Sequence, residues 1–402
     1  MKRVVITGQG TINSLGNNVS DTNTALMSGQ SGIKKFDYNN DQTLNSKIGA
    51  KIKNYDPHVF FDKKDISILD FFSQFALISA SEAVQSSGLI FSDKLSDETG
   101  VIIGSAGGGL STQEENYRLV FEDRKNRVHP FIIPRMMHNA AASNIAKKYS
   151  LKGPTYSVSS ACASSNHAIT NAYNLIRFGE TRVMLAGGAD AMLTFGGMKA
   201  WESLRVMSSS GCRPFCMTRD GLVQGEGAAV FVLEEYEHAS KRGANILAEI
   251  KGCSMTSDGY DLVAPSKKGM KNAISKSLSD ARLSADKINY INAHGTGTKI
   301  NDEMEANVLS SFFSKNDDIP KVSSTKSGHG HVMGATSAIE LLPCILALRE
   351  NIVVPTIGVV KKDPMIDIDL VCSEAQERQV EVAMSNSFAF GGLNSVIILK
   401  SV

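Results

Sequence analysis

Apolar residues along the chain follow two alternating patterns: short runs rich in β-branched residues, and longer segments in which they recur with helical spacing. The short runs predict strands at 3–7, 100–104, 155–159, 182–188, 228–234, 246–252, 288–294, 321–325, 382–387 and 395–400. The longer segments predict helices between them, including 73–88, 168–179 and 335–350. Strands that alternate with helices in this way are typical of an α/β fold with largely buried sheets.

The pattern also contains a faint internal repeat. In residues 155–176 a strand runs through a turn of small residues into a helix, and the same layout recurs in residues 320–345. A chain of 402 residues has room for two domains or for one large domain built from two halves. We therefore expect two similar α/β halves, residues 1–240 and 241–402, and a site at their junction that draws residues from both.

Composition and charge exclude several classes of function. The net charge is only +1, and Lys and Arg form no cluster interleaved with aromatic residues, so nucleic acid is not an expected partner. No apolar stretch reaches the about 18 residues of a membrane span, and the apolar run near the N-terminus is too short for a signal peptide. The six cysteines are scattered without a disulfide framework, which suits the reducing cytoplasm.

Nucleotide and metal sites are not predicted either. The Gly-rich segment at 8–16 follows a strand, but its third Gly is misplaced and no suitable acidic residue follows in a second strand. Cys212 and Cys216 could suggest a metal, as could a His-x-His pair further along the chain, but no second cysteine pair follows. The carboxylates near the His-x-His pair lie on helical segments rather than at strand ends, so we expect no metal ion.

Cys162 is the strongest candidate for chemistry. It lies where a predicted strand turns into a predicted helix, in a run of Ala and Ser whose only acid or base is one His. The unpaired N–H groups and the dipole of a helix N-terminus favour a thiolate, and small neighbours leave room for a thin substrate. Taken alone, a free cysteine is explained equally well as a small buried apolar residue.

Two strand ends in the second half offer partners for this thiol. NAHGTGT places His294 at the end of a strand, and SSTKSGHGH gathers Lys326, His329 and His331 in one turn before a helix. A single His is usually structural, but two such segments at strand ends of the same half favour a catalytic site. With these partners, nucleophilic catalysis by Cys162 becomes the preferred interpretation.

A further segment, SNSFAFGGLNS, places two Gly after two Phe in a loop between predicted strands. Such a loop can offer backbone N–H groups to an oxyanion while the Phe side chains control access. By itself the segment is only a β-hairpin signal.

Taken together and in order, these segments resemble the β-ketoacyl-acyl carrier protein synthases of the elongating type, in the thiolase superfamily. The resemblance rests on SSACASSNHA, PFCMTRDGLVQGEGAAVFVLEEYEHASKRGA, NAHGTGT, SSTKSGHGHVMGA and NSFAFGGLN, and it extends over essentially the whole chain. It implies a duplicated thiolase fold of five layers (α-β-α-β-α) that works as a dimer. It also implies an acyltransferase that condenses malonyl-acyl carrier protein, with loss of CO₂, onto an acyl chain carried by the enzyme.

The resemblance implies roles for individual residues. Cys162 would take the acyl group, and His294 and His331 would bind the malonyl thioester carbonyl so that decarboxylation yields a stabilised enolate. Backbone N–H groups of Cys162 and Phe390 would form the oxyanion hole, with Phe390 also acting as a gate. No metal is implied, and no cofactor beyond the phosphopantetheine that the acyl carrier protein brings.

Supporting residues follow from the same resemblance. Lys326 would hold the histidine network through Glu340, and Thr296 and Thr298 match positions that contact pantetheine. The acyl pocket would be lined by Gly107, Trp201, Met333 and Phe390.

Two pocket residues depart from the fatty-acid relatives. Gly107 stands where those relatives often carry a bulky Ile, and Trp201 stands where they place a Phe. The first change should open the tunnel and the second adds a flat wall, which together suggest a longer, stiffer or unsaturated acyl chain. Further departures are Ser164 and Ser165 after the cysteine, the extra His329, and Leu393 in place of Thr.

Partner and pathway stay open at this level. Lys63 and Lys64, with Arg124 and Arg205, would face the acidic carrier. The rest of the 61–72 segment differs from the basic helix that the relatives carry there. The difference reflects either simple drift or an adaptation to a dedicated carrier or an unequal partner subunit. The dimer could be a homodimer or a heterodimer with a chain-length-factor-like subunit. The chain could itself be such a non-catalytic subunit, although these usually lack the cysteine. Primary fatty-acid elongation and a type II polyketide pathway both fit.

Overall fold

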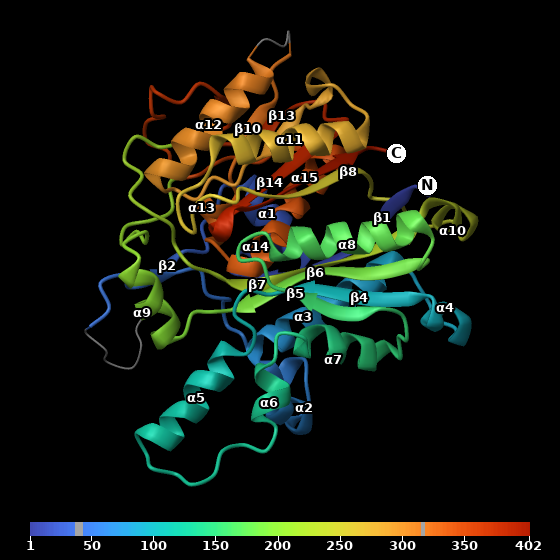
Figure 1. Cartoon of the computed structure of the whole chain (residues 1–402), viewed down its shortest axis with the longest axis vertical. Coiled ribbons are helices and arrows are strands. Elements are labelled where there is room, and N and C mark those ends of the chain that lie inside the picture. Colours follow the sequence, from blue (N-terminus) through green and yellow to red (C-terminus); the bar gives the residue numbers. More distant parts are fainter. Residues whose placement is uncertain (37–42, 315–317) are drawn as a thin grey trace.

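The computed structural model describes residues 1–36, 43–314 and 318–402, and within them the main sheet has 11 strands (Figure 1). In chain order these are β1 (Val4–Asn13), β4 (Thr99–Gly104), β5 (Thr155–Val158), β6 (Val183–Ala191), β7 (Glu226–Glu235), β8 (Ala248–Ser257), β9 (Tyr290–Asn292), β10 (Lys321–Ser323), β12 (Asp369–Leu370), β14 (Val382–Ala389) and β15 (Leu393–Lys400). Two small sheets pair β2 (Lys34–Lys35) with β3 (Ile48–Gly49), and β11 (Ile352–Val353) with β13 (Gln376–Glu377). Every strand predicted from the sequence overlaps a strand of the main sheet.

The two halves of the chain repeat one sheet topology. The first half contributes the order β5-β4-β6-β7-β1 and the second half β10-β9-β14-β15-β8. In both halves the first two strand pairs are parallel and the last two are antiparallel. The duplication expected from the sequence is therefore confirmed. The halves join where β1 pairs with β8, with Val4 opposite Ile250. The position of the boundary between the halves, at residue 240, stays a prediction.

Helices complete the layers on both sides of each half-sheet. They are α1 (Val19–Met27), α2 (Lys63–Ile68), α3 (Phe71–Ser87), α4 (Asp93–Asp97), α5 (Leu110–Phe121), α6 (Ile132–Met136), α7 (Ala140–Tyr149), α8 (Ser164–Phe178), α9 (Phe195–Ser203), α10 (Tyr236–Lys241), α11 (Lys267–Ala281), α12 (Lys299–Phe313), α13 (Lys326–His329), α14 (Thr336–Ile339) and α15 (Leu341–Glu350). In Figure 1, α3 and α7 lie below the first half-sheet, α8, α14 and α15 lie between the two half-sheets, and α11 and α12 lie above the second. This order gives the expected five layers. Among the described residues, no helix is both long and apolar enough to cross a membrane.

Apolar side chains form three large cores among these layers. Phe75 packs in the lower core, beneath the first half-sheet, and Ile274 packs in the upper core, above the second. The central core combines Ile169 of α8 with Leu341 and Ile345 of α15, so it draws on both halves. Burial of one shared core fixes the two half-sheets relative to each other, and with them the loops at their strand ends.

The structure differs from the sequence prediction at two helices next to the site. The helix predicted at 335–350 is interrupted at Glu340, between α14 and α15. Pro343 lies in the first turn of α15, where it has no N–H to continue the helix that precedes it. Helix α8 begins at Ser164, before the apolar spacing starts, and the Ser164 hydroxyl accepts the Ser160 N–H of the preceding turn at 2.8 Å.

We expect Ile345→Ala to lower the free energy of unfolding by about 2–5 kcal/mol, because it leaves a cavity in the shared central core. Ile345 is 1% exposed in that core. Chemical denaturation would measure the loss. Ile90, which is 88% exposed, supplies the control: Ile90→Ala should change the free energy by no more than about 0.5 kcal/mol. Equal losses in both variants would contradict the assignment of the core.

Candidate active site

Cys162 lies in a strained turn between β5 and α8. The preceding Ala161 has φ +50°, a left-handed conformation that is unfavourable for a residue with a side chain. The turn places Cys162 just before the first turn of α8 and leaves the residue 6% exposed. The sequence therefore located the thiol correctly, at the junction of a strand and a helix.

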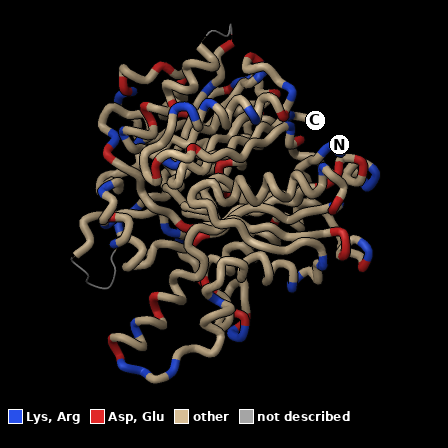
Figure 2. Tube along the Cα trace, in the orientation of Figure 1, with Lys and Arg blue, Asp and Glu red and all other residues tan. Residues whose placement is uncertain are grey.

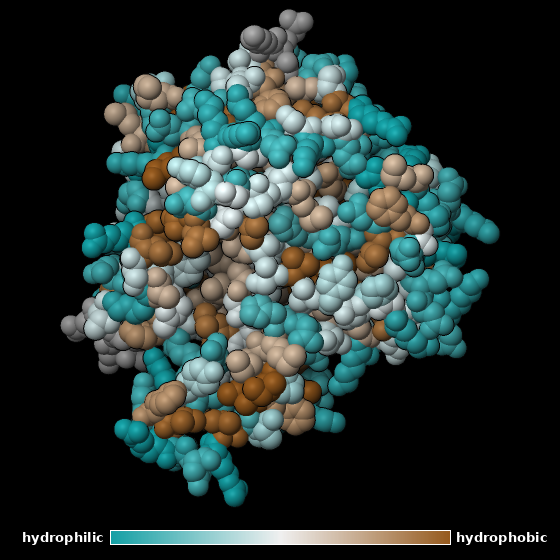
Figure 3. Space-filling view, viewed as in Figure 1, coloured by the Kyte–Doolittle hydropathy of each residue, from teal (hydrophilic) through white to brown (hydrophobic). Residues whose placement is uncertain are grey.

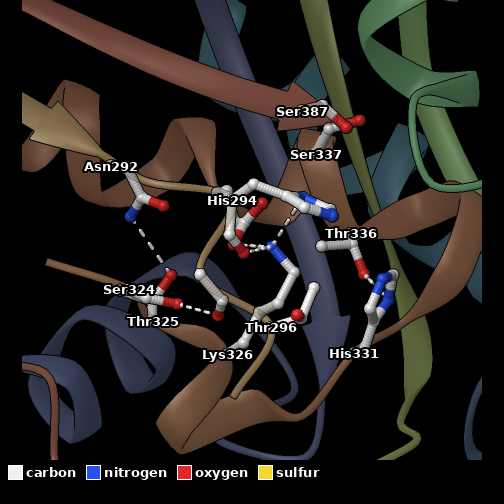
Figure 4. Close-up of polar contacts among 12 residues, drawn as sticks. Asn292, His294, Thr296, Ser324, Thr325, Lys326, His331, Thr336, Ser337 and Ser387 are labelled. Carbon is white, nitrogen blue, oxygen red and sulfur yellow. Dashed lines mark hydrogen bonds and ion pairs between the residues drawn. The ribbon is translucent and has the colours of Figure 1, made fainter. Parts of the chain in front are cut away.

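The second half of the chain holds the backbone of this cysteine in place. Two hydroxyl groups donate to the Cys162 carbonyl oxygen, from Ser337 of α14 at 3.3 Å and from Ser387 of β14 at 3.1 Å. Ser165 of α8 in turn lies 2.7 Å from the Ser337 hydroxyl. Figure 4 shows Ser337 and Ser387 side by side above the histidines. The nucleophile is thus fixed by contacts that exist only because the two halves pack together.

The structure brings His294 and His331 to the thiol. His294 follows β9 and His331 follows α13, as the sequence indicated. The Cys162 sulfur and one ring nitrogen from each histidine lie within 4.8 Å of one another. The two rings stand nearly perpendicular, with centroids 5.8 Å apart and an angle of 88° between their planes.

Hydrogen bonds fix the tautomer of both rings. The Met333 backbone N–H donates to His331 Nδ1 at 3.0 Å, and the Lys326 ammonium lies 3.4 Å from His294 Nδ1. A backbone N–H and an ammonium can only donate, so both Nδ1 atoms are acceptors. The neutral rings therefore carry their proton on Nε2. Two N–H donors are left available for an oxygen beside the thiol.

Burial keeps both histidines neutral. It lowers the pKa of His294 and of His331 well below the ordinary value, and the nearby Lys326 ammonium lowers both pKa values further. Lys326 itself is fully buried and is neutralised by Glu340, whose carboxylate accepts at 2.6 Å. The same ammonium donates to the His294 carbonyl oxygen at 2.5 Å (Figure 4). One buried cation thus orients a histidine and prevents it from taking up a proton.

The surroundings of Cys162 act against the thiolate that its position before a helix favours. Burial raises the pKa of Cys162 to about 11, although the Lys326 charge and the backbone N–H groups of Phe390 and Cys162 act in the opposite direction. The position before a helix is as expected, but the apolar surroundings outweigh it. Ala163, Ala389 and Leu393 pack against the cysteine. Burial thus favours the protonated thiol in the free enzyme.

A cavity of about 400 Å³ connects the thiol to the surface, and residues of both halves line it. The lining includes Cys162, Trp201, Arg205, Leu222, Asp261, Val263, His294, Thr296, Thr298, Lys299, Ile300, His331 and Phe390. The hydroxyls of Thr296 and Thr298 lie 2.8 Å apart. The ring of Trp201 stacks on that of Phe390, with centroids 5.8 Å apart and 19° between the planes. These residues therefore line the same cavity as Cys162.

Two residues expected in the acyl pocket are not part of this lining. The space beside Gly107 is filled by Met192, since a Cβ built on Gly107 would lie 2.8 Å from Met192 Cγ. The Met192 side chain therefore occupies the space that a side chain at Gly107 would take. Met333 is 1% exposed and has φ +46°, and its contribution is the backbone N–H that sets the tautomer of His331.

The cysteine and the two histidines could be considered as metal ligands, because Cys, His and His are common zinc ligands. Lys326 argues against this interpretation, since its ammonium lies against His294 and would repel a cation. A zinc-bound ring also needs a nitrogen with a free lone pair directed at the metal. In both rings Nδ1 already accepts a hydrogen bond, and Nε2 carries the proton. The arrangement fits a group of N–H donors better than a metal centre.

Sequence reasoning missed several residues that hold the site. Glu305 of α12 accepts the backbone N–H groups of His294 and Gly295, each at 2.8 Å. The Thr336 hydroxyl lies 3.1 Å from His331 Nδ1, and Ser337 and Ser387 hold the Cys162 carbonyl oxygen as described above (Figure 4). Glu305 could have been found from its spacing, because a carboxylate in the first turns of a helix can reach back to the loop before it. The serines carry no such signal.

Comparison with known families agrees with this geometry. A family model described as "Beta-ketoacyl synthase, N-terminal domain" matches residues 1–239, and one described as "Beta-ketoacyl synthase, C-terminal domain" matches residues 247–360. The chain belongs to the β-ketoacyl synthase family. It is thus a condensing enzyme with an acyltransferase activity, built on the duplicated thiolase fold.

Individual relatives of this β-ketoacyl synthase match it over its whole length. It is 41% identical over 401 residues to a nodulation protein E of Rhizobium sp. (strain N33), with 100% of both chains covered. It is 38% identical over 409 residues to a 3-oxoacyl-[acyl-carrier-protein] synthase 2 of Coxiella burnetii, covering 100% of this chain and 99% of the relative. The solved structure of the ishigamide ketosynthase/chain length factor aligns with a TM-score of 0.94 at 29% identity, covering 100% and 99% of the two chains.

The resting thiol gives a test of the electrostatics. Alkylation of Cys162 by iodoacetamide, followed by peptide mass mapping, should accelerate about tenfold per pH unit through the alkaline range, because the thiolate fraction rises tenfold per unit below the pKa. Lys326→Met should slow the reaction at each pH, since the cation that favours the thiolate is removed. A rate that levels off near neutral pH would show that the thiolate already exists at rest.

Proposed function

We propose that this β-ketoacyl synthase condenses malonyl-acyl carrier protein with an acyl chain held on Cys162. The observation that carries the proposal is the meeting of the Cys162 sulfur with two histidine nitrogens within 4.8 Å, on rings that keep their proton on Nε2. A buried nucleophile opposite two neutral N–H donors suits a reaction that passes through oxyanions.

The first step is transfer of the acyl group to the enzyme. The Cys162 sulfur attacks the carbonyl of the acyl thioester, and the oxyanion that forms is stabilised by the backbone N–H groups of Cys162 and Phe390. The C–S bond to the pantetheine then breaks, and the pantetheine sulfur leaves with the proton that Cys162 gives up. Thr296 and Thr298, whose hydroxyls line the cavity, would bind the pantetheine arm.

The second step forms the new carbon–carbon bond. The malonyl thioester carbonyl accepts the Nε2–H groups of His294 and His331, so the negative charge left by departing CO₂ settles on an oxygen between two donors. The resulting enolate attacks the acyl carbonyl on Cys162. The C–S bond to the cysteine breaks, and the sulfur takes up a proton from water that enters the cavity. Loss of CO₂ supplies the electron pair, so no metal or redox cofactor is needed.

The partners that we propose follow the same chemistry. The first is an acyl carrier protein, which the Coxiella relative names in its description. The second is another subunit, either a copy of this chain or a chain-length-factor-like protein of the kind named with the ishigamide ketosynthase. The proposal of a second subunit is supported by apolar side chains on the segment from α5 to α6. Phe121 is 67% exposed and Ile133 is 57% exposed, and Figure 3 shows apolar surface over this segment.

A non-catalytic role fits less well. A silent partner subunit has no use for a nucleophile with two tautomer-locked histidines around it, and here all of these groups are present and oriented. Fatty-acid elongation and type II polyketide synthesis both remain open as pathways. The free cysteines suit the reducing cytoplasm that we propose as its location.

We expect the purified protein to gain the mass of an acyl group after exposure to an acyl carrier protein that bears this group as a thioester. The Cys162→Ala variant should gain none, because the sulfur is the only proposed point of attachment. Intact mass spectrometry would measure the gain. His331→Ala should still load the acyl group but should lose about 10²–10³-fold in malonyl decarboxylation, as when one oxyanion donor is removed. Loading of Cys162→Ala at the same rate would overturn the assignment.

The aromatic pair at the gate predicts a preference among acyl chains. Trp201 presents a flat ring to the cavity, so we expect conjugated dienoyl groups to load faster than saturated groups of equal length. Trp201→Phe should reduce this ratio by about threefold to tenfold, the value of a lost stacking contact of about 1 kcal/mol. Loading rates from intact mass would give the ratio, and since Trp201 is the only Trp of the chain, its fluorescence reports the same event. An unchanged ratio would exclude this role.

A further inference from the structure

A buried carboxylate lies beside the turn that follows His331. It belongs to Asp190, near the end of β6, and this residue is fully buried. Strand β6 packs against the 3₁₀ turn Met333–Ala335 and the helix α14 that comes after it (Figure 1). In Figure 2 most charged residues lie along the outer helices and loops, and the central strands carry few. A carboxylate inside the sheet is therefore unusual and requires partners.

Four donors surround this carboxylate. Oδ1 accepts from the Ser105 hydroxyl at 2.7 Å and from the Gly107 N–H at 3.0 Å. Oδ2 accepts from the Ala106 N–H at 3.0 Å and from the Gly334 N–H at 2.6 Å. Each oxygen thus has two donors, which is the full capacity of an ionised carboxylate. Asp190 therefore connects a loop of the first half of the chain to a turn of the second half.

The turn that Asp190 contacts is the one that sets the tautomer of His331. The Met333 N–H donates to His331 Nδ1 at 3.0 Å, and Met333 has φ +46°, which is unfavourable for a residue with a side chain. A strained conformation of this kind persists only where the surrounding structure holds it. Gly334 is the next residue, so its hydrogen bond to Asp190 holds the strained turn directly.

Close packing fixes the same turn from the other side. A Cβ built on Gly334 would lie 2.4 Å from the Ala106 nitrogen and 2.7 Å from Asp190 Oδ2. The turn therefore rests on the loop after β4 and on the carboxylate at once. Without the carboxylate, three buried N–H groups would have no acceptor, which is costly enough for the turn to shift until they find others.

We propose that Asp190 is a positioning residue for the condensation step, because it holds His331 in the orientation that directs Nε2–H at the malonyl thioester carbonyl. This inference rests on the proposed function, in which His331 stabilises the enolate oxygen. The hydrogen-bond partners of Asp190 among the described residues do not include Cys162 or Phe390, whose N–H groups serve acyl transfer. The effect of Asp190 should therefore fall on decarboxylation and spare the loading of the cysteine.

The two half-reactions give the test. Asp190→Ala should lower kcat for decarboxylation of malonyl-acyl carrier protein by about 10–100-fold, which is less than the loss of an oxyanion donor itself, with little change in KM. The rate at which an acyl carrier protein thioester loads Cys162 should fall by less than about threefold, because the groups used in that step are untouched. Asp190→Asn should keep decarboxylation within about threefold, since its amide oxygen can still accept from Gly334.

The tautomer of His331 gives a readout that does not depend on activity. Nitrogen NMR spectra of histidine-labelled protein, assigned by the signals missing in His331→Ala, should show an unprotonated Nδ1 in the unaltered protein and in Asp190→Asn. In Asp190→Ala the ring should report a mixture of the two tautomers, because the Met333 N–H no longer points at Nδ1. A pure Nε2–H tautomer in Asp190→Ala would overturn the proposal.

A core variant separates positioning from folding. Ile145 of α7 is fully buried in the lower core, and Ile145→Ala should lower the melting temperature without favouring either half-reaction. If Asp190→Ala does not fold, Asp190→Ser replaces it, because its side chain is one bond shorter than the carboxylate and leaves Gly334 without its acceptor. Equal losses in both half-reactions, or no loss in either, would show that Asp190 does not position His331.

An unaltered protein that loads no acyl group and decarboxylates no malonyl thioester would instead contradict the proposed function. The tautomer measurement would then still decide whether Asp190 holds His331. The two failures are therefore distinguishable.

Discussion

The arrangement of the active site depends on the buried ion pair between the Lys326 ammonium and the Glu340 carboxylate. The ammonium lies against His294 and Glu340 with no exposure to solvent. An unpaired charge at such a position would cost several kcal/mol. The lysine is tolerated there because it is paired with the carboxylate of Glu340, which lies at the break between helices α14 and α15. The ammonium in turn fixes the tautomer of His294, and its charge adds to burial in keeping both rings neutral. Removing either partner of the pair would leave the other buried and uncompensated.

The duplicated sheet explains why these groups can meet. Each half repeats the same strand order, so corresponding strand ends point to the same side of the central helices. The first half supplies the cysteine before α8, and the second supplies the histidines after β9 and α13. Packing of α8 against α14 then places Ser337 under the Cys162 carbonyl. Catalytic geometry is thus a consequence of burying the shared core, and a mutation in that core would affect the site without touching it.

Much of this could be predicted from the sequence, and the parts that could not share a cause. Strand positions follow from runs of β-branched residues, and the site residues follow from polar residues at strand ends, because both are local signals. The pKa of Cys162 is not local: it depends on Ala163, Ala389 and Leu393 packing around the sulfur, two of which are more than 200 residues away in the chain. The same holds for Met192 beside Gly107 and for the backbone N–H of Met333 at His331. Tertiary packing decides each of them.

The protonation pattern determines what the site can do. A resting thiol with a pKa of about 11, beside two rings that already carry their protons on Nε2, leaves no strong base next to the sulfur. The site is therefore organised to stabilise oxyanions rather than to remove protons. In acyl transfer this is sufficient, because the proton that Cys162 loses is needed by the departing pantetheine sulfur, so the exchange between the two sulfurs is balanced. In condensation the electron pair comes from the carboxylate that leaves as CO₂, and again no proton has to be abstracted from carbon. An apolar site with fixed donors suits both steps.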